Sequence, residues 1–349
     1  MRKFDYSFLK RISVPADIMN SATSIYEMKA KAELRRSDFA EVFSAMESVA
    51  KIQSVKSSNA IEGIITTDKR IRDIVNKSAA PQGHNELEIA GYRDALDLIH
   101  GSYSEIPFSE KSILELHRIL LQPSGDDLAG RYKTEDNFIM ETDREGVRSV
   151  RFTPVPASET AFALEQLILA YHAAYSDAEI NPLMLIPCVI LDLLCIHPFR
   201  DGNGRMSRLL SLLLMYKSGF NAGKYVSIEE QINTYKNYYY TSLQKSSERW
   251  HENDNNYFPF IENFLFDLKM SYFELDSRFA SLKDRKITKK QRIEELVTGS
   301  LLTVSKREIC EKLPDISVTT VEVELGRLLK SGEIEKIGNG RGTKYRCCH

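Results

Sequence analysis

Residues 197–208 hold, in one short stretch, side chains that could bind a polyphosphate and deprotonate a neighbouring hydroxyl. The stretch reads His-Pro-Phe-Arg-Asp-Gly-Asn-Gly-Arg-Met-Ser-Arg. It combines an imidazole that titrates near neutral pH, a carboxylate, an amide between two glycines, and guanidinium groups that match phosphate oxygens. This set suits chemistry on a phosphate group that is held together with a divalent metal ion. The spacing differs from that of a Walker A loop, Gly-x-x-x-x-Gly-Lys.

The segments on both sides of this stretch are predicted to be buried helices. Residues 183–196 are apolar almost throughout and are long for a strand, and residues 209–216 are rich in Leu. The turn at 202–204 is expected to open the second helix, where glycines allow a close backbone approach and free N–H groups favour an anion. Neither segment has about 20 uninterrupted apolar residues, so no membrane span is expected.

The charged residues of the stretch have ordinary explanations when each is taken alone. Arg205 and Arg208 are three apart, which puts them on one helix face that could simply be solvated. Asp201 would be repelled by phosphates unless a cation such as Mg²⁺ lay between them. The combination of all these residues between two buried helices favours a phosphate site over a surface loop.

The stretch resembles the signature of Fic-domain proteins, HPFx[D/E]GNGRxxR, and every defined position is present. The resemblance implies a mostly α-helical fold, with a Fic-type core, a small β-hairpin flap and a C-terminal winged helix-turn-helix domain. It also implies transfer of AMP from ATP to a Tyr, Ser or Thr hydroxyl of a target protein and of the enzyme itself. Relatives with kinase-like activity differ at the positions of Gly204 and Arg208, and both residues are intact here.

The same resemblance implies a role for each residue of the signature. The roles are general base for His197, anchor of the loop for Phe199, Mg²⁺ ligand for Asp201, anion hole for Gly202, Asn203 and Gly204, β-phosphate contact for Arg205 and γ-phosphate contact for Arg208.

Residues 58–63, Ser-Asn-Ala-Ile-Glu-Gly, end a helical pattern that begins near residue 37. Ser58 and Glu62 share a helix face, and Gly63 is a plausible helix stop. An ordinary helix end with a surface Glu would look the same. The stretch resembles the [S/T]xxxE[G/N] inhibitory motif of Fic proteins, which implies that Glu62 pairs with Arg208 and keeps the γ-phosphate from binding productively. A Glu at this place could also position water for the reverse reaction.

Two β-prone runs at 136–140 and 150–154 enclose a polar stretch with Gly146, a pattern typical of a hairpin. The resemblance implies that residues 136–152 form a flap that aligns the target by strand addition. The tyrosine-rich run at 235–240 could line a nucleotide-base pocket, pack as an aromatic face, or be modified by the enzyme itself.

The layout of the chain favours several domains in a cytoplasmic protein. Its 349 residues and 42% hydrophobic content suit two or three globular domains, predicted at 1–105 (N-terminal helices), 106–275 (catalytic core) and 285–349. Helices are expected at 86–100 and 109–121, and two more within 16–78. The net charge of −2 indicates no general attraction to nucleic acid or membrane. Five cysteines without a CxxC pair suit a reducing compartment. His117 and His172 are interpreted as packing or surface residues.

Residues 285–349 are basic, with 14 Lys and Arg against 9 Asp and Glu. Helical patterns at 289–298, 306–313 and 317–330, followed by two short β-prone runs around a glycine-rich tip, resemble a winged helix. A DNA-binding role would place Thr319, Thr320 and Arg327 in a groove and Arg341 and Lys344 on phosphates. Glu322 and Glu324 oppose this role, and many such domains contact proteins or support homodimers instead.

Two further hypotheses compete with ATP-dependent AMP transfer. One is an enzyme that removes AMP from modified protein, alone or together with the forward reaction. The other is a DNA-binding regulator in which the nucleotide site only senses its ligand, a reading that salt-dependent DNA binding without transfer would support.

Overall fold

The computed structural model divides the chain into two compact units, residues 1–277 and 278–349. The structure describes residues 2–142, 146–283, 289–298, 303–313, 316–338, 340 and 343–347. The predicted phosphate contact of Arg341 therefore lies outside the described residues. Among the helices that are described, none is both long and apolar enough to cross a membrane.

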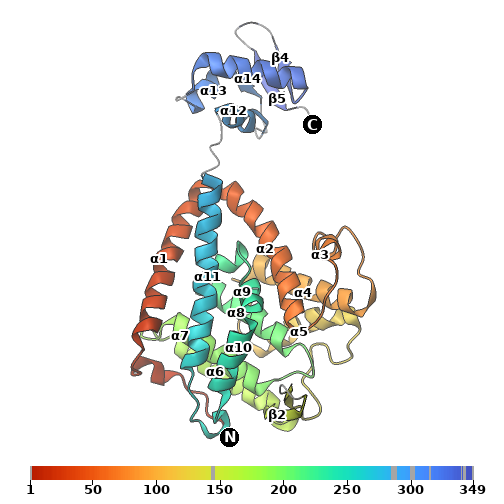
Figure 1. Ribbon diagram of the computed structural model, residues 1–349, viewed down its shortest axis with the longest axis vertical. Helices are drawn as coiled ribbons and strands as arrows, with labels where there is room; N and C mark the ends of the chain where they lie inside the picture. Colours follow the sequence, from red (N-terminus) through yellow and green to blue (C-terminus); the bar gives the residue numbers. More distant parts are fainter. Residues whose placement is uncertain are drawn as a thin grey trace. The chain divides into compact units, whose positions relative to one another are not determined.

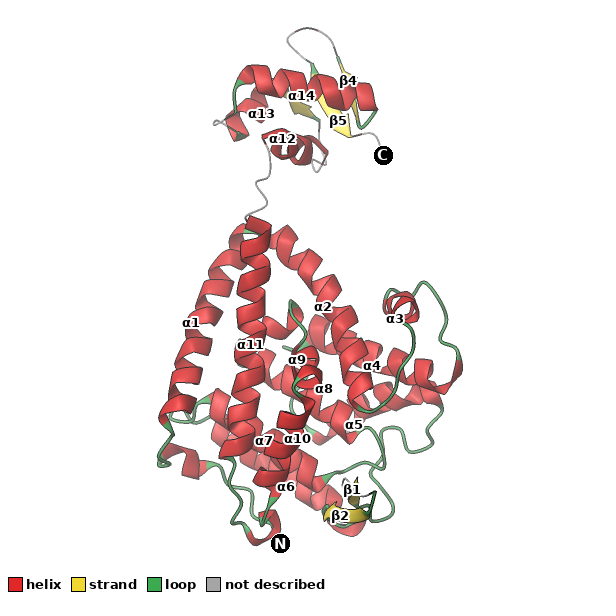
Figure 2. Cartoon of the chain, in the orientation of Figure 1, coloured by secondary structure: helices red, strands yellow, loops and turns green. Residues whose placement is uncertain are grey.

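The first unit is almost entirely helical (Figures 1 and 2). Its α-helices are α1 (Ala16–Asp38), α2 (Ala40–Ile61), α3 (Asp68–Val75), α4 (Gly83–Ser102), α5 (Glu110–Leu121), α6 (Thr160–Tyr175), α7 (Pro182–Ile196), α8 (Asn203–Lys217), α9 (Ile228–Thr234), α10 (Lys236–Ser247) and α11 (Phe258–Lys283). Short 3-10 helices lie at Ser7–Lys10, Gln122–Ser124, Ala157–Glu159, Ala222–Lys224 and Trp250–Glu252. The mostly α-helical fold predicted from the sequence is thus confirmed.

Residues 16–78 contain three helices, so the expectation of two was wrong. The additional helix is α3, which begins where the Thr67 side chain accepts the backbone N–H of Arg70. A Thr at this position is a recognised start signal for a helix. Ile71, Ile74 and Val75 bury one face of the helix, and this packing stabilises a segment that is too short to be helical alone.

Helices α7 and α8 form the centre of the unit and carry the stretch at 197–208 between them. The Asn181 side chain caps α7 by accepting the N–H of Leu183, and Pro182 occupies the first helical position, where a missing N–H costs nothing. Almost every residue of α7 is buried. It packs against α6 and α8, and α8 also contacts α4. The predicted pair of buried helices is present.

A two-stranded antiparallel hairpin is the only sheet among the described residues of this unit. Strand β1 (Ile139–Thr142) pairs with β2 (Arg148–Phe152), with Ile139 opposite Phe152 and Met140 opposite Val150. The register shifts between the first two of these pairs. The hairpin predicted for 136–152 is therefore formed.

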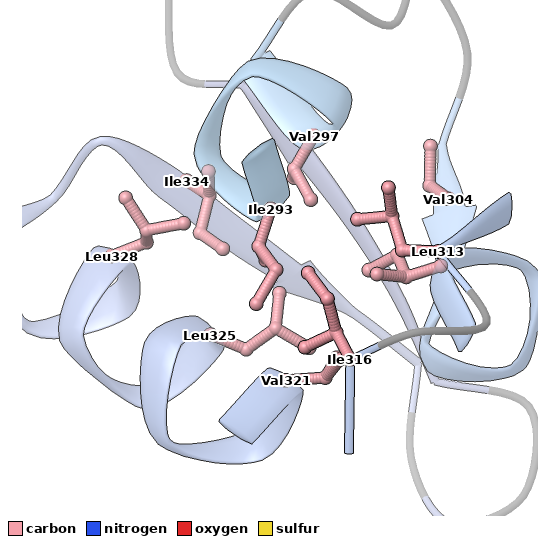
Figure 3. Close-up of a cluster of buried hydrophobic side chains, with 10 residues drawn as sticks. Ile293, Val297, Val304, Leu313, Ile316, Val321, Leu325, Leu328 and Ile334 are labelled. Carbon is pink, nitrogen blue, oxygen red and sulfur yellow. The ribbon is translucent and has the colours of Figure 1, made fainter. Parts of the chain in front are cut away.

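The second unit contains three helices and two strands near the positions that the sequence predicts, and a third, short strand, β3, that was not predicted. The elements are α12 (Lys289–Thr298), β3 (Val304–Ser305), α13 (Lys306–Lys312), α14 (Val318–Ser331), β4 (Ile334–Ile337) and β5 (Lys344–Cys347). The antiparallel strands lie in the order β3-β5-β4. Ten buried aliphatic side chains, among them Ile293, Val321 and Leu325, form its core (Figure 3).

The surface of α14 is neutralised by ion pairs within the second unit. The Arg327 guanidinium contacts the carboxylates of Glu294, Glu324 and Glu333, and Glu322 pairs with Lys306. Arg327, which the DNA-binding hypothesis would place in a groove, is therefore already engaged by three carboxylates.

Candidate active site

The loop that joins α7 to α8 turns through left-handed backbone at both of its ends. His197 ends α7 with φ 51° and ψ 63°, and Gly202 precedes α8 with φ 78°. The first conformation is uncommon for a residue with a side chain, and the second favours glycine. Such a conformation persists at His197 because the surrounding packing holds it, a frequent property of functional sites.

His197 is poised as a neutral base. Its Nδ1 lies 3.3 Å from the carbonyl oxygen of Leu194, and since a carbonyl can only accept, Nδ1 carries the proton. The lone pair is then on Nε2. Removal from water lowers the pKa of His197 from 6.5 to about 4, so the ring is uncharged at neutral pH. Its side chain lines the cavity described below.

Phe199 is buried and is held from two sides. The side chain of Asn203 makes two hydrogen bonds to the backbone of Phe199. Its amide oxygen accepts the N–H of Phe199 at 3.0 Å, and its amide nitrogen donates to the carbonyl of Phe199 at 2.8 Å. The ring stacks on His117 with centroids 3.7 Å apart and planes 7° apart. These contacts fix Phe199 within the loop, and the side chain of Asn203 is engaged by its backbone.

His117, on α5, fixes the loop through both of its ring nitrogens. Nε2 donates to the carbonyl of Asp201 at 3.1 Å, and Nδ1 accepts the N–H of Gly130 at 3.0 Å. Burial lowers the pKa of His117 to about 4, which keeps this single neutral tautomer. The sequence predicts a packing or surface role for His117; the residue is buried, and its contact with the loop was not predicted. The sequence does contain one indication of this role: His117 is a polar residue on the helix face that also carries the buried Ile113 and Leu120.

Lys133 and Asn137 brace the loop from the segment that leads into the hairpin. The backbone N–H of Lys133 donates to the carbonyl of Pro198, and its ammonium donates to Asn137 at 2.9 Å. Asn137 in turn donates to the carbonyl of Phe199 at 3.2 Å. Burial lowers the pKa of Lys133 to about 8. Nothing in the sequence around these residues indicated this role.

The N-terminus of α8 presents unpaired backbone donors. The amides of Asn203, Gly204 and Arg205 lie in the first turn, where a helix provides no partner, and the first N–H bonded within the turn is that of Met206. With its side chain engaged by Phe199, Asn203 can offer a ligand its backbone N–H. The helix terminus therefore suits an anion.

Asp201 and Arg205 differ sharply in exposure. The Asp201 side chain is 63% exposed and accepts the N–H of Gly202 at 2.6 Å. The Arg205 side chain is 1% exposed, between Glu88 of α4 at 2.5 Å and Asp201 at 3.3 Å. Glu88, which was not predicted as a site residue, supplies the negative charge that makes a buried guanidinium tolerable. In this structure Arg205 is enclosed by protein and braces the loop against α4.

Arg208 is held by the end of α2. Its Nε donates to Ser58 Oγ at 2.8 Å, and its Nη2 donates to the Ser58 carbonyl at 2.9 Å and to Glu62 Oε1 at 2.8 Å. The Arg208 side chain is 3% exposed and that of Glu62 33%. A Cβ at Gly204 would overlap Glu62 Oε1, so the carboxylate lies directly on this glycine. The structure thus brings Ser58, Glu62 and Arg208 together.

Four of the residues described above, Glu62, His197, Gly204 and Arg208, border one cavity of about 220 Å³. It is lined by Glu62, Ile139, Arg151, Phe152, Leu194, Cys195, His197, Gly204, Arg208, Tyr239, Tyr240, Leu243 and Ser247. The hairpin supplies one wall and α10 another. The tyrosines of residues 235–240 lie in two different environments. Tyr239 and Tyr240 line the cavity, whereas Tyr235 and Tyr238 pack edge-on against Phe266.

Residues 107–215 match the model of the Fic/DOC family. They form a Fic domain. The match covers the hairpin, helices α5 to α7 and most of α8, and thus the loop with His197.

The Fic relatives include proteins named adenylyltransferases. The chain is 31% identical to "Protein adenylyltransferase Fic" of Nematostella vectensis over 181 residues, 49% of this chain and 39% of that protein. It is 30% identical to "Protein adenylyltransferase fic-1" of Caenorhabditis elegans over 194 residues, 54% of this chain and 33% of that protein. The chain thus spans about two fifths or less of the length of these curated relatives.

Solved structures show the same fold. A Fic family protein from Desulfovibrio desulfuricans G20 aligns with a TM-score of 0.64 at 19% identity over 97% of both chains. Fic-1 from C. elegans, residues 134–508, aligns with a TM-score of 0.56 at 22% identity, over 76% of this chain and 74% of the other.

Proposed function

We propose that this protein transfers AMP from ATP to a Tyr, Ser or Thr hydroxyl of a target protein and of itself, and that Glu62 inhibits the transfer. One observation carries the proposal. A single cavity joins a neutral histidine with a free Nε2, the donor-rich N-terminus of α8, and an arginine occupied by a carboxylate. The names of the curated Fic relatives support the same reaction class.

In the proposed step, His197 Nε2 accepts the proton of the target hydroxyl. The hydroxyl oxygen forms a bond to the α-phosphorus while the bond from that phosphorus to the α–β bridging oxygen breaks, and pyrophosphate leaves with the electron pair. The backbone N–H groups of Asn203 and Gly204 face the developing negative charge. Tyr239 and Tyr240 provide aromatic surface for the base of the nucleotide.

Asp201 fits the role of a Mg²⁺ ligand. Its carboxylate is exposed, and the N–H of Gly202 and the hold of His117 on its carbonyl orient it. No group of three or more His, Cys, Asp or Glu suited to a metal occurs among the described residues. Mg²⁺ is commonly held by one or two carboxylates together with substrate phosphates. When bound, the ion would neutralise phosphate charge.

Inhibition follows from competition for Arg208. A γ-phosphate needs the donors that Glu62 now accepts, since Arg forks match phosphate and carboxylate equally well. The space left by the missing Cβ of Gly204 is filled by the same carboxylate. We infer that Glu62 must leave this position before ATP binds productively.

Removal of AMP from modified protein is the second candidate, because Glu62 and His197 line the same cavity. A carboxylate there can orient water, whose oxygen forms a bond to the α-phosphorus while the bond from that phosphorus to the protein oxygen breaks. His197 accepts a proton from the water and passes it to the departing protein oxygen, so that AMP and the free hydroxyl are released. Release of AMP from labelled protein by the wild type, and its loss in Glu62→Gly, would favour this reaction.

The target is proposed to lie along the hairpin at 136–152. Exposed apolar side chains on it, Phe138, Met140 and Val150, suit a polypeptide partner. Homodimer formation, contact of residues 285–349 with DNA, and a cytoplasmic location stay predictions.

The decisive experiment compares ATP labelled at the α-phosphate with ATP labelled at the γ-phosphate, in the presence of Mg²⁺ and cell lysate. The Glu62→Gly protein should transfer the α-label to protein and retain none of the γ-label, and Glu62→Gly/His197→Ala should transfer neither. Transfer of the γ-label would indicate a kinase. Absence of both labels would reject the proposal.

A further inference from the structure

The inhibitory residue stands at the end of a helix whose last turn is closed by a specific set of backbone bonds. The N–H of Ile64 donates to the carbonyl of Asn59, and that of Gly63 to the carbonyl of Ala60, both at 3.0 Å. Gly63 has φ 81°. This is a Schellman motif, in which a left-handed glycine lets two terminal N–H groups turn back onto the helix. Glu62 is the residue that the motif holds between helix and turn.

The motif leaves the carbonyl of Ile61 without a backbone partner, and a side chain from another helix takes it. Lys236 Nζ donates to Ile61 O at 2.6 Å. Lys236 is the first residue of α10, the helix whose Tyr239 and Tyr240 line the nucleotide cavity. A cation at a helix C-terminus both satisfies a free carbonyl and interacts favourably with the helix dipole.

The rest of α2 is fixed by buried contacts that do not involve Lys236. Ser54, fully buried, donates to Glu229 of α9 at 2.7 Å, and Glu229 also accepts from Tyr92 and Ser227. Helix α2 packs along α9 and α4. Departure of the whole helix would break this network, whereas movement of its last turn would not. Release of Glu62 is therefore easiest as a local opening of the turn that Lys236 holds.

We propose that Lys236 is a positioning residue for the inhibitory carboxylate, which it keeps on Arg208 by fixing the end of α2. The inference rests on the proposed function, because it deepens the account of inhibition at that same site. Loss of the ammonium leaves the Ile61 carbonyl to water and shifts the last turn toward open conformations. From the usual stabilisation that a cation provides at a helix C-terminus, we expect loss of the Lys236 ammonium to increase basal AMP transfer by about 2- to 10-fold.

The test measures transfer of the α-label by Lys236→Met, with Lys236→Arg and Lys245→Met as controls, in the wild-type and Glu62→Gly backgrounds. Lys236→Arg retains the donor, and Lys245→Met removes an exposed charge from the same helix. Lys236→Met should raise transfer only where Glu62 is present. An equal rise in both backgrounds, or no rise in the wild type, would overturn the proposal.

Hydrogen exchange provides a readout independent of activity. The amides of residues 62–64 should exchange faster in Lys236→Met, while those of residues 50–58 remain protected. If Glu62→Gly itself transfers no label, the proposed function has failed, and exchange still decides whether Lys236 holds the turn. Unchanged exchange at residues 62–64 would refute the role of Lys236 in either case.

Discussion

Replacement of Glu62 by Gly removes the carboxylate that occupies Arg208 but leaves the arginine in place. Arg208 keeps two hydrogen bonds to Ser58, one to its hydroxyl and one to its carbonyl. The guanidinium should therefore stay pointed at the N-terminus of α8. The space in front of Gly204 becomes free at the same time. Both changes favour a bound triphosphate.

The size of the effect follows from the contact that is lost. A hydrogen bond between charged groups has a net value of roughly 1.5–3 kcal/mol. Because the Glu62 side chain is 33% exposed, solvent weakens the pair and the lower part of that range applies. A value of about 1.5–2 kcal/mol corresponds to a roughly 10- to 30-fold rise in AMP transfer at ATP below saturation.

The assay is initial-rate transfer of α-labelled AMP by wild type, Glu62→Gly and Glu62→Gln at several ATP concentrations. Gln keeps the volume in front of Gly204 but loses the charge, so its rate should fall between the other two. Equal rates for wild type and Glu62→Gly, with transfer that still depends on His197, would show that the ion pair does not control nucleotide binding.

Three further results are expected. Because burial lowers the pKa of His197 to about 4, the base is protonated only below about pH 4. The acidic limb of the rate profile of Glu62→Gly should therefore lie at or below pH 4, since the variant lacks a carboxylate that raises this pKa, and a limb at 6.5 would contradict this. Gly204→Ala should destabilise the wild type by about 1 kcal/mol in thermal unfolding, and should cost nothing in Glu62→Gly, because the added methyl group meets the Glu62 carboxylate. His117→Phe keeps the ring stack on Phe199 but loses both hydrogen bonds, and should lower kcat about tenfold with a smaller change in KM; an unchanged kcat would assign His117 to packing alone.

The local features of the site could be predicted because each depends on neighbours in the chain. An apolar run of helical length predicted α7, the glycines at 202–204 predicted the start of α8, and Gly63 predicted the end of α2. The short helix α3 escaped prediction, since its stability comes mainly from a buried face that its eight residues alone do not reveal.

Pairings across the fold could not be predicted in the same way. Three contacts join residues that are far apart in sequence, and no sequence pattern links the partners. They are the ion pair of Glu88 with Arg205, the ring stack of His117 on Phe199, and the hydrogen bond from Lys236 to the carbonyl of Ile61. The commitment of the Asn203 amide to Phe199 likewise appears only when the loop is closed. Ion pairs and stacks of this kind depend on which helices pack together.

The sequence by itself determined the chemistry available at 197–208, the carboxylate at residue 62 and the two helices that flank residues 197–208. These properties follow from residue type and local periodicity, which act over a few residues. Only the tertiary structure decided that the Glu62 carboxylate also lies against Gly204, that Arg205 is enclosed by Glu88, and that Lys236 closes the end of α2. Those contacts arise because burial of α2, α4 and α8 against one another brings distant charges within bonding distance, and each buried charge must then find a partner.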